Sequence, residues 1–253
     1  MNGVFESYSS HSSYSSYHSL SVATARFVAD YIRANPGALL CLAAGDTPLG
    51  AFAELVRMNK TEQVDLGSVF YVGLDEWVGL GPEDLGSCWQ VMHDNFYTPA
   101  GIPKERMRVF DGLAEPAEEC ERMDEWVRRH GGIGLTLLGV GMNGHVGFNE
   151  PYDRRLACRE DVDRRGRLSY VVPLDETTKS VSTKYFGAPR PVTHGVTISL
   201  EALRAARQII VMASGEKKRE IIRKSFYSEP SPEVPASMLQ GHGNLIFLTD
   251  FNI

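Results

Sequence analysis

The 253-residue sequence lacks several features that mark well-known classes of protein. Its four cysteines are far apart and form no CxxC pair, so we expect free structural thiols and no metal site at Cys41, Cys88, Cys120 and Cys158. No apolar run reaches the roughly 18 residues of a membrane-spanning helix, and the N-terminus lacks the apolar core of a signal peptide. We therefore expect a cytoplasmic protein that is not bound to a membrane.

Charge and phosphate-binding motifs exclude further partners. The formal net charge is −6 and no block of lysine and arginine is long enough for a nucleic-acid surface, so we expect no nucleic-acid partner. The chain has no GxxxxGK[ST] loop of the kind that holds nucleotide phosphates. A bound phosphate would therefore need a local cluster of positive charge.

The absence of repeats and linkers indicates a single domain. No internal repeat is present, and no linker divides the chain. We expect one domain over residues 20–253. Residues 1–19, rich in Ser, Tyr and His, are expected to be flexible or to form an irregular first strand. A metal-binding tract is the alternative there, with only His11 and His18 to support it.

Patterns typical of strands and of helices alternate along the sequence. This order predicts an α/β, Rossmann-like fold in which a mainly parallel sheet carries helices on both faces. The expected helices cover residues 20–34, 49–59, 86–97 and 116–130. The expected strands cover residues 38–43, 68–74, 107–110, 135–140, 167–174, 194–200, 207–215 and 244–250, the last of which closes the sheet.

Polar residues follow four of the expected strands at the point where each strand ends. Open parallel sheets bind ligands beyond the carboxyl ends of their strands, so we expect these residues to meet in one crevice. They are Asp46-Thr47, Asp75-Glu76, Asn143 with His145, and Ser214-Gly215.

Two of these segments have features that favour anion binding. In "LAAGDTPLG" (42–50), small residues join a strand to a helix, and the N–H groups of such a turn bind anions. The alternative is a tight turn with Thr47 as the helix N-cap and Pro48 at the first helical position. In "SGEKK" (214–218), Lys217 or Lys218 could meet a phosphate, or each could be solvated surface.

The other two segments carry groups suited to proton transfer. In "GLDEWVGL" (73–80), Asp75 could act as a general base in a partly dry crevice, or serve as a helix cap or ion-pair partner. "LLGVGMNGHVGFNEP" (137–151) sets His145 among four glycines, with Glu150 five residues later to orient the imidazole. A buried structural histidine is the alternative reading of His145.

Together these segments resemble the glucosamine-6-phosphate deaminase/isomerase family, from about residue 20 to about residue 250. "GVGMNGHVGFNEP" is similar to the family signature G-[IV]-G-x-[DN]-G-H-[IV]-[AG]-F-N-E-P. "GLDEWVGL", "AAGDTPLG" and "VPASMLQGH" resemble its DE-aromatic-VGL segment, its phosphate loop and its late helix. The related 6-phosphogluconolactonases lack the NEP ending. Trp77, "CLAAGDTPL" and "RPVTHGVTISL" resemble the galactosamine-6-phosphate branch more closely.

The resemblance implies an enzyme that converts galactosamine 6-phosphate or glucosamine 6-phosphate into a ketohexose 6-phosphate and ammonia. It implies no metal and no other cofactor. In this scheme His145 helps to open the sugar ring, and Asp75 moves a proton from C2 to C1 through an enediol-type intermediate. Glu150 and Asn143 orient and tune His145.

The resemblance also implies which residues bind the phosphate. Gly45 and Thr47 hold it in the loop around Asp46, Lys218 is the phosphate lysine, and Lys179 matches a position where some members carry an arginine. Residues 152–186 resemble a lid over the site. The family usually has a small residue at the position of Asp46, because an acid beside a phosphate is unfavourable unless it points away.

Two other functions fit the residues. One is a lactonase of the same fold, which needs no base at C2, and the other is a sugar-phosphate-binding protein without catalysis. The partner expected in each case is a small-molecule sugar phosphate. The oligomeric state is open, and a homo-oligomer is possible.

Overall fold

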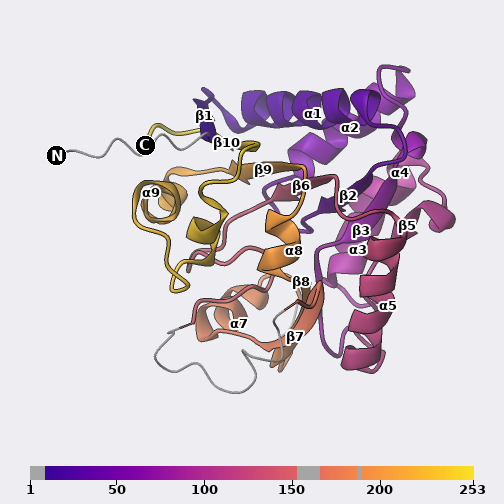
Figure 1. The fold of residues 1–253 in the computed structure, drawn as a ribbon, viewed down its shortest axis with the longest axis vertical. Coiled ribbons are helices and arrows are strands. Elements are labelled where there is room, and N and C mark those ends of the chain that lie inside the picture. Colours follow the sequence, from indigo (N-terminus) through magenta and orange to yellow (C-terminus); the bar gives the residue numbers. More distant parts are fainter. Residues whose placement is uncertain (1–8, 153–165, 187–189) are drawn as a thin grey trace.

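Seven parallel strands run through the middle of the computed structural model, which describes residues 9–152, 166–186 and 190–253 (Figure 1). Each strand is parallel to its neighbours, so all the carboxyl ends meet at one edge. In spatial order the strands are β1 (Ser9–Ser13), β10 (Leu245–Thr249), β9 (Gln208–Ala213), β6 (Leu135–Leu138), β2 (Leu39–Leu42), β3 (Phe70–Gly73) and β5 (Met107–Arg108).

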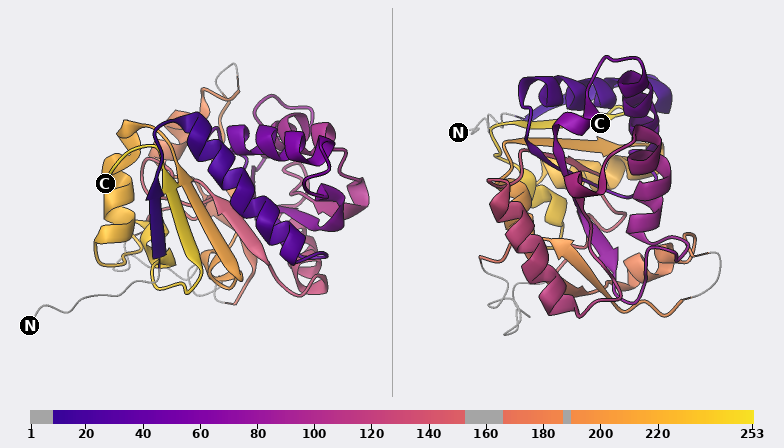
Figure 2. Two further views of the ribbon diagram at one scale, coloured as in Figure 1. Left: turned by 90° about the horizontal axis from the view of Figure 1, so that it is seen from above. Right: turned by 90° about the vertical axis from the view of Figure 1, so that its right-hand side faces the viewer.

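Helices cover both faces of this sheet because successive strand residues point to opposite sides. In β2, Leu40 and Leu42 belong to one core, whereas Leu39 and Cys41 belong to the other. The first core contains α1 (Tyr17–Ala34), which lies across the strands in the left panel of Figure 2, α2 (Leu49–Lys60) and α4 (Thr98–Ala100). The second core contains α5 (Pro116–Arg129), α8 (Leu200–Arg204) and α9 (Arg219–Tyr227).

The remaining helical segments are short. Residues 86–97, expected as one helix, divide into α3 (Cys88–Met92) and a π-helix at His93–Tyr97. The other segments are α7 (Glu176–Ser182) and the 3-10 turns Leu66–Ser68, Lys104–Arg106, Glu216–Lys218 and Pro235–Leu239. No helix among the described residues is long and apolar enough to cross a membrane.

A second, antiparallel sheet corrects the expectation that residues 167–174 and 194–200 join the parallel sheet. Its strands are β4 (Asp75–Trp77), β8 (His194–Ile198) and β7 (Ser169–Pro173) in that order. Hydrophobic periodicity identifies a strand but not its partner, and β8 pairs with the chain directly after β3. The small core of this sheet, with Trp77, Phe148 and Phe186, places α7 beyond the main sheet (Figure 1).

Residues 9–19, the described part of the serine-rich N-terminal segment, contain a first strand, which was one of the two expected outcomes, but this strand is regular and the first helix follows it. β1 pairs in parallel with β10 and takes the edge position, so residues 244–250 do not close the sheet. The His11 ring stacks on Phe247 at 4.2 Å, and His11 Nε2 lies 3.0 Å from Thr249 Oγ1. Helix α1 begins at Tyr17 behind a capping box of Ser16 and Ser19.

The thiol prediction holds where the structure tests it. Cys41, Cys88 and Cys120 are free, and Cys158 lies outside the described residues. Residues 1–8 also lie outside them, as do residues 153–165 of the expected lid at 152–186. That the chain forms one domain stays a prediction.

Candidate active site

A cavity of about 730 Å³ lies at the carboxyl ends of β2, β3, β6 and β9. This volume falls in the range of about 300–1,000 Å³ that is usual for small-molecule sites. Each of the four polar segments that follow these strands contributes to its wall, as the strand order predicts. The contributing residues are Asp46 and Thr47, Asp75, Asn143 and His145, and Ser214.

The turn after β6 brings His145 into the cavity. Gly141 N donates to His145 O at 2.8 Å, and Gly144 has a φ of 89°, which favours glycine. A Cβ atom on Gly141 would lie 2.3 Å from His145 Nε2. The glycines therefore let the imidazole lie directly against its own turn.

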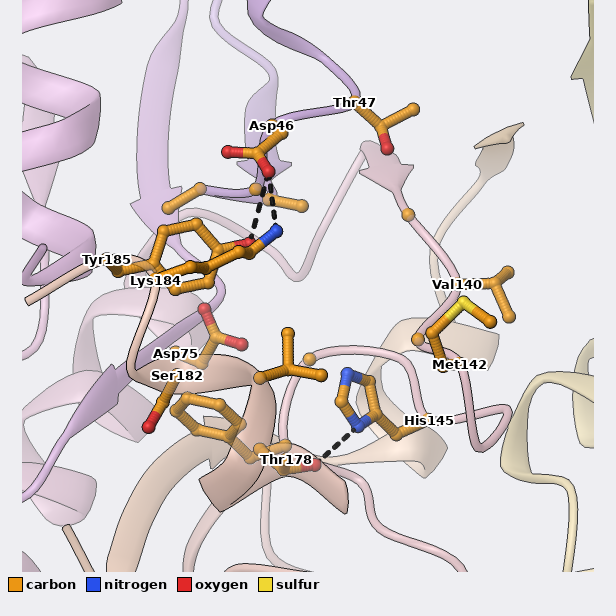
Figure 3. A pocket seen from close by; sticks show the side chains of 18 of the residues that line it. Asp46, Thr47, Asp75, Val140, Met142, His145, Thr178, Ser182, Lys184 and Tyr185 are labelled. Atoms are coloured by element: carbon orange, nitrogen blue, oxygen red, sulfur yellow. Dashed lines mark hydrogen bonds and ion pairs between the residues drawn. The ribbon is translucent and has the colours of Figure 1, made fainter. Parts of the chain in front are cut away.

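Two side chains hold one nitrogen of this imidazole. His145 Nδ1 lies 3.1 Å from Glu150 Oε2. It also lies 3.0 Å from Oγ1 of Thr178, which comes from α7 (Figure 3). An ionised carboxylate can only accept, so we assign the proton to Nδ1. Nε2 has no hydrogen-bond partner among the described residues and is left for a ligand.

Glu150 is suited to this orienting role because it stays ionised. Burial raises the pKa of Glu150, but the hydrogen bond and charge of His145, with hydrogen bonds from Thr178 and Asn143, lower it further, so the net shift is downward. An ionised carboxylate fixes the orientation and tautomer of a neighbouring imidazole.

Asn143 connects this pair to α7. Its Nδ2 donates to Glu150 Oε2 at 3.1 Å and to Asp175 Oδ1 at 3.3 Å, and its Oδ1 accepts from His145 N at 3.2 Å. Asp175 also caps α7 by accepting from Thr177 N at 2.8 Å. Sequence reasoning missed Asp175 and Thr178, since only the spatial position of α7 reveals them.

Asp75 faces the same cavity from the other side of the site (Figure 3). Burial raises the pKa of Asp75 to about 6; the charge of His145 and a hydrogen bond with the Cys88 thiol lower it, and the charge of Glu150 raises it. Such a carboxylate is mostly ionised at neutral pH and yet holds a proton more strongly than an exposed one. That combination suits a general base.

Glu76 turns away from the cavity, as period-two alternation along a strand requires. Its carboxylate is buried and accepts three backbone N–H groups, from Trp77 at 2.8 Å, Cys88 at 2.9 Å and Trp89 at 2.8 Å. The helix-capping alternative considered for Asp75 therefore applies to its neighbour. Glu76 fixes the backbone on both sides of Cys88 and so supports the position of Asp75.

The loop at Gly45–Thr47 has hydrogen-bond donors without an acceptor among the described residues. The expectation that Thr47 is the N-cap of α2 is wrong. Pro48, not Thr47, is the N-cap of α2, and no side chain caps the helix. The donors in question are the Thr47 hydroxyl and the three backbone N–H groups of residues 45–47. The Tyr17 hydroxyl donates to Thr47 O at 3.0 Å and accepts from Gly50 N at 2.8 Å, which holds the loop against α1.

Three lysines line the cavity near this loop: Lys184, Lys217 and Lys218. Burial, followed by the charges of Lys217 and Lys184, lowers the pKa of Lys218 to about 8. The Lys218 ammonium donates to Val140 O. This cluster is the local positive site that the acidic chain would need for a phosphate.

Lys179 is not part of this cluster. Its Nζ lies 2.8 Å from Glu176 Oε1 within α7, and it is absent from the cavity wall. Lys184, five residues later, projects into the cavity instead. The sequence placed a lysine of this segment at the site, but it could not show that α7 turns Lys179 outward.

An α/β fold with an aspartate, a histidine and clustered lysines around one cavity at its strand ends is suited to an enzyme that acts on an anionic substrate, and the comparisons with known proteins identify the family. The chain belongs to the family of glucosamine-6-phosphate isomerases and 6-phosphogluconolactonases, whose model matches residues 12–148 and 171–247. The glucosamine-6-phosphate deaminase of Halothermothrix orenii is 35% identical over 233 residues, which cover 91% of this chain and 92% of that protein.

Another relative and two solved structures are also similar to this chain. The glucosamine-6-phosphate deaminase of Thermoanaerobacter sp. (strain X514) is 33% identical over 91% of this chain and 88% of its own length. A solved monomeric glucosamine-6-phosphate deaminase matches with a TM-score of 0.84 and 31% identity, covering 95% of this chain and 96% of that one. The 6-phosphogluconolactonase of Thermotoga maritima, with a TM-score of 0.73 and 16% identity, shares the fold.

We predict that Glu76→Ala lowers the free energy of unfolding by about 3 kcal/mol, because it leaves one buried and two partly buried N–H groups without their acceptor. Urea denaturation followed by circular dichroism measures this. Glu83→Ala is the control, since Glu83 is exposed in the same β4–α3 connection and should change stability little. Equal stability of the two variants would contradict the supporting role of Glu76.

Proposed function

We propose that this protein converts a hexosamine 6-phosphate and water into a ketohexose 6-phosphate and ammonia. The observation that carries the proposal is the placement of Asp75 and His145 in one cavity with three lysines and an unused donor loop. The names of the relatives, glucosamine-6-phosphate deaminases, support the same activity.

Ring opening is the first step of the proposed reaction. The sugar binds as a ring, and its C1–O5 bond breaks as a proton reaches O5 and the C1 hydroxyl loses its proton to give the aldehyde. His145 is the proton carrier in this proposal, through the free Nε2. Glu150, Thr178 and Asn143 keep the ring of His145 in place.

Isomerisation follows at C1 and C2. The Asp75 carboxylate takes the proton from C2, and the electrons of the broken C–H bond form an enediol-type intermediate that still carries the amine. Asp75 then returns a proton to C1, which leaves an iminium group at C2. Water adds to that carbon and ammonia departs, so that C2 becomes the ketone.

The phosphate is held at the other end of the cavity in this scheme. The N–H groups of Gly45–Thr47 and the Thr47 hydroxyl donate to its oxygens, and Lys218 and Lys184 contribute charge. Lys184 replaces Lys179 in the proposal because only Lys184 lines the cavity.

A lactonase that used the same cavity would need no base at C2. Asp75 lies in the wall with a raised pKa, which favours the deaminase. We also propose a slight preference for the galacto epimer, supported by Trp77 and by the 190–200 segment "RPVTHGVTISL". The relatives named above carry the gluco name, so both epimers enter the test.

We predict ammonia release from at least one of galactosamine 6-phosphate and glucosamine 6-phosphate, with the galacto epimer slightly faster. The two sugars are assayed side by side, with 6-phosphogluconolactone as the third substrate. Fast hydrolysis of the lactone without ammonia from either sugar would replace the deaminase by the lactonase.

We predict that Asp75→Asn lowers kcat by about 10²–10⁴-fold while substrate binding is largely kept, as expected for loss of a general base. In the wild type, activity falls as Asp75 becomes protonated, so kcat/KM should decline below a pH of about 6. Cys88→Ala removes a hydrogen bond that lowers the pKa of Asp75, so this acid limb should move to higher pH. Exchange of the C2 proton at the wild-type rate in Asp75→Asn would exclude Asp75 as the base.

We predict that Lys218→Ala and Lys184→Ala raise KM more than they lower kcat, because each removes an interaction made in both the ground state and the transition state. Lys179→Ala should leave KM nearly unchanged, since Lys179 pairs with Glu176 outside the cavity. Steady-state kinetics of the three variants decide the point. A large rise of KM in Lys179→Ala alone would show that Lys179, and not Lys184 or Lys218, binds the phosphate.

A further inference from the structure

The loop proposed to hold the phosphate carries a carboxylate, and that carboxylate already has a partner. Asp46 Oδ2 lies 2.6 Å from Lys184 Nζ and 3.5 Å from the Tyr185 hydroxyl (Figure 3). Lys184 Nζ also lies 4.3 Å from the centre of the Tyr185 ring. An ion pair therefore joins the loop after β2 to the segment after α7.

The lysine in this pair is one of the three that line the cavity. Lys217 has no ion-pair partner among the described residues, and Lys218 donates to a carbonyl. Lys184 is the one cavity lysine whose charge is balanced by a carboxylate among the described residues. The Asp46 carboxylate thus already binds Lys184, one of the groups that a substrate phosphate would use.

The ion pair is weak enough to exchange. The side chain of Lys184 is 49% exposed and that of Asp46 is 62% exposed. Exposed ion pairs contribute about 0.2–1 kcal/mol. A phosphate ester carries a charge of about −1.5 to −2 near pH 7 and offers three acceptor oxygens, so it is the stronger partner for an ammonium group.

We propose that Asp46 is an internal competitor of the substrate phosphate. Without substrate its carboxylate pairs with Lys184; the phosphate displaces it on binding, and the carboxylate pairs with Lys184 again as the product phosphate leaves. Asp46 therefore sets the affinity of the site by lowering it. This rests on the proposed function only in that the ligand of the site is a phosphate ester.

The test measures binding of inorganic phosphate by isothermal titration calorimetry at fixed ionic strength, without turnover. Asp46→Asn keeps the shape of the side chain and removes its charge. We expect a three- to tenfold lower Kd, roughly the value of an exposed ion pair plus the lost repulsion. Asp84→Asn is the matched control, because it breaks another partly exposed ion pair, with Arg190, outside the cavity wall, and should leave Kd unchanged.

A second background separates competition from simple repulsion. Lys184→Met keeps most of the length of the side chain and removes the charge for which the two anions compete. In that background Asp46→Asn should change the phosphate Kd by less than about twofold. An undiminished effect there, or an unchanged or higher Kd for Asp46→Asn alone, would overturn the proposal.

The result is also separable from the proposed reaction. A tighter phosphate site in Asp46→Asn with no ammonia from either amino sugar would keep the competitor and reject the deaminase. Ammonia release with identical phosphate affinity in wild type and Asp46→Asn would support the deaminase and reject Asp46 as a competitor of the phosphate. Where both proposals hold, Asp46→Asn also lowers the KM of the amino sugar phosphate by a factor similar to the change in Kd.

Discussion

The common direction of the seven strands is the constraint on which the site depends. Because all carboxyl ends meet at one edge, residues far apart in the sequence become neighbours there. The four strands that supply the cavity, β9, β6, β2 and β3, are adjacent in the sheet. From β2 the chain continues to β3 on one side, while β6 lies on the other, and such a switch in strand order opens a crevice between the connecting loops.

The segment around α7 completes what the parallel sheet begins. At its start, Asp175 and Thr178 contact Asn143 and His145. At its end, Lys184 contacts Asp46 in the loop after β2. Residues 175–184 therefore contact both the proton-transfer groups and the anion-binding groups, although these residues are not part of the parallel sheet whose strand ends carry those groups. The antiparallel pairing of β7 with β8 is what brings this stretch to the edge of the main sheet.

Local patterns predicted most of the fold and which strand ends line the cavity, whereas contacts between distant segments could not be predicted. Helices α1, α2 and α5 and the strand ends follow from periodicity, as does the opposite orientation of Asp75 and Glu76. The antiparallel sheet, the edge position of β1 and the choice of Lys184 over Lys179 depend on how elements meet in space. A helix pattern shows that residues share a face but not which neighbour that face meets. The roles of the site residues and the preferred epimer stay predictions.

The serine-rich strand β1 has a consequence for the state of the protein in solution. It covers the backbone of β10, whose residues Leu245–Thr249 are mostly buried and apolar. Among the described residues, the edge strand on this side of the sheet then consists of four serines and one histidine, which offer little apolar surface to another chain. Exposed apolar edge strands are sites of aggregation. The serine-rich β1 thus keeps the apolar β10 from being the exposed edge strand, which lowers the tendency of the sheet to aggregate on this side.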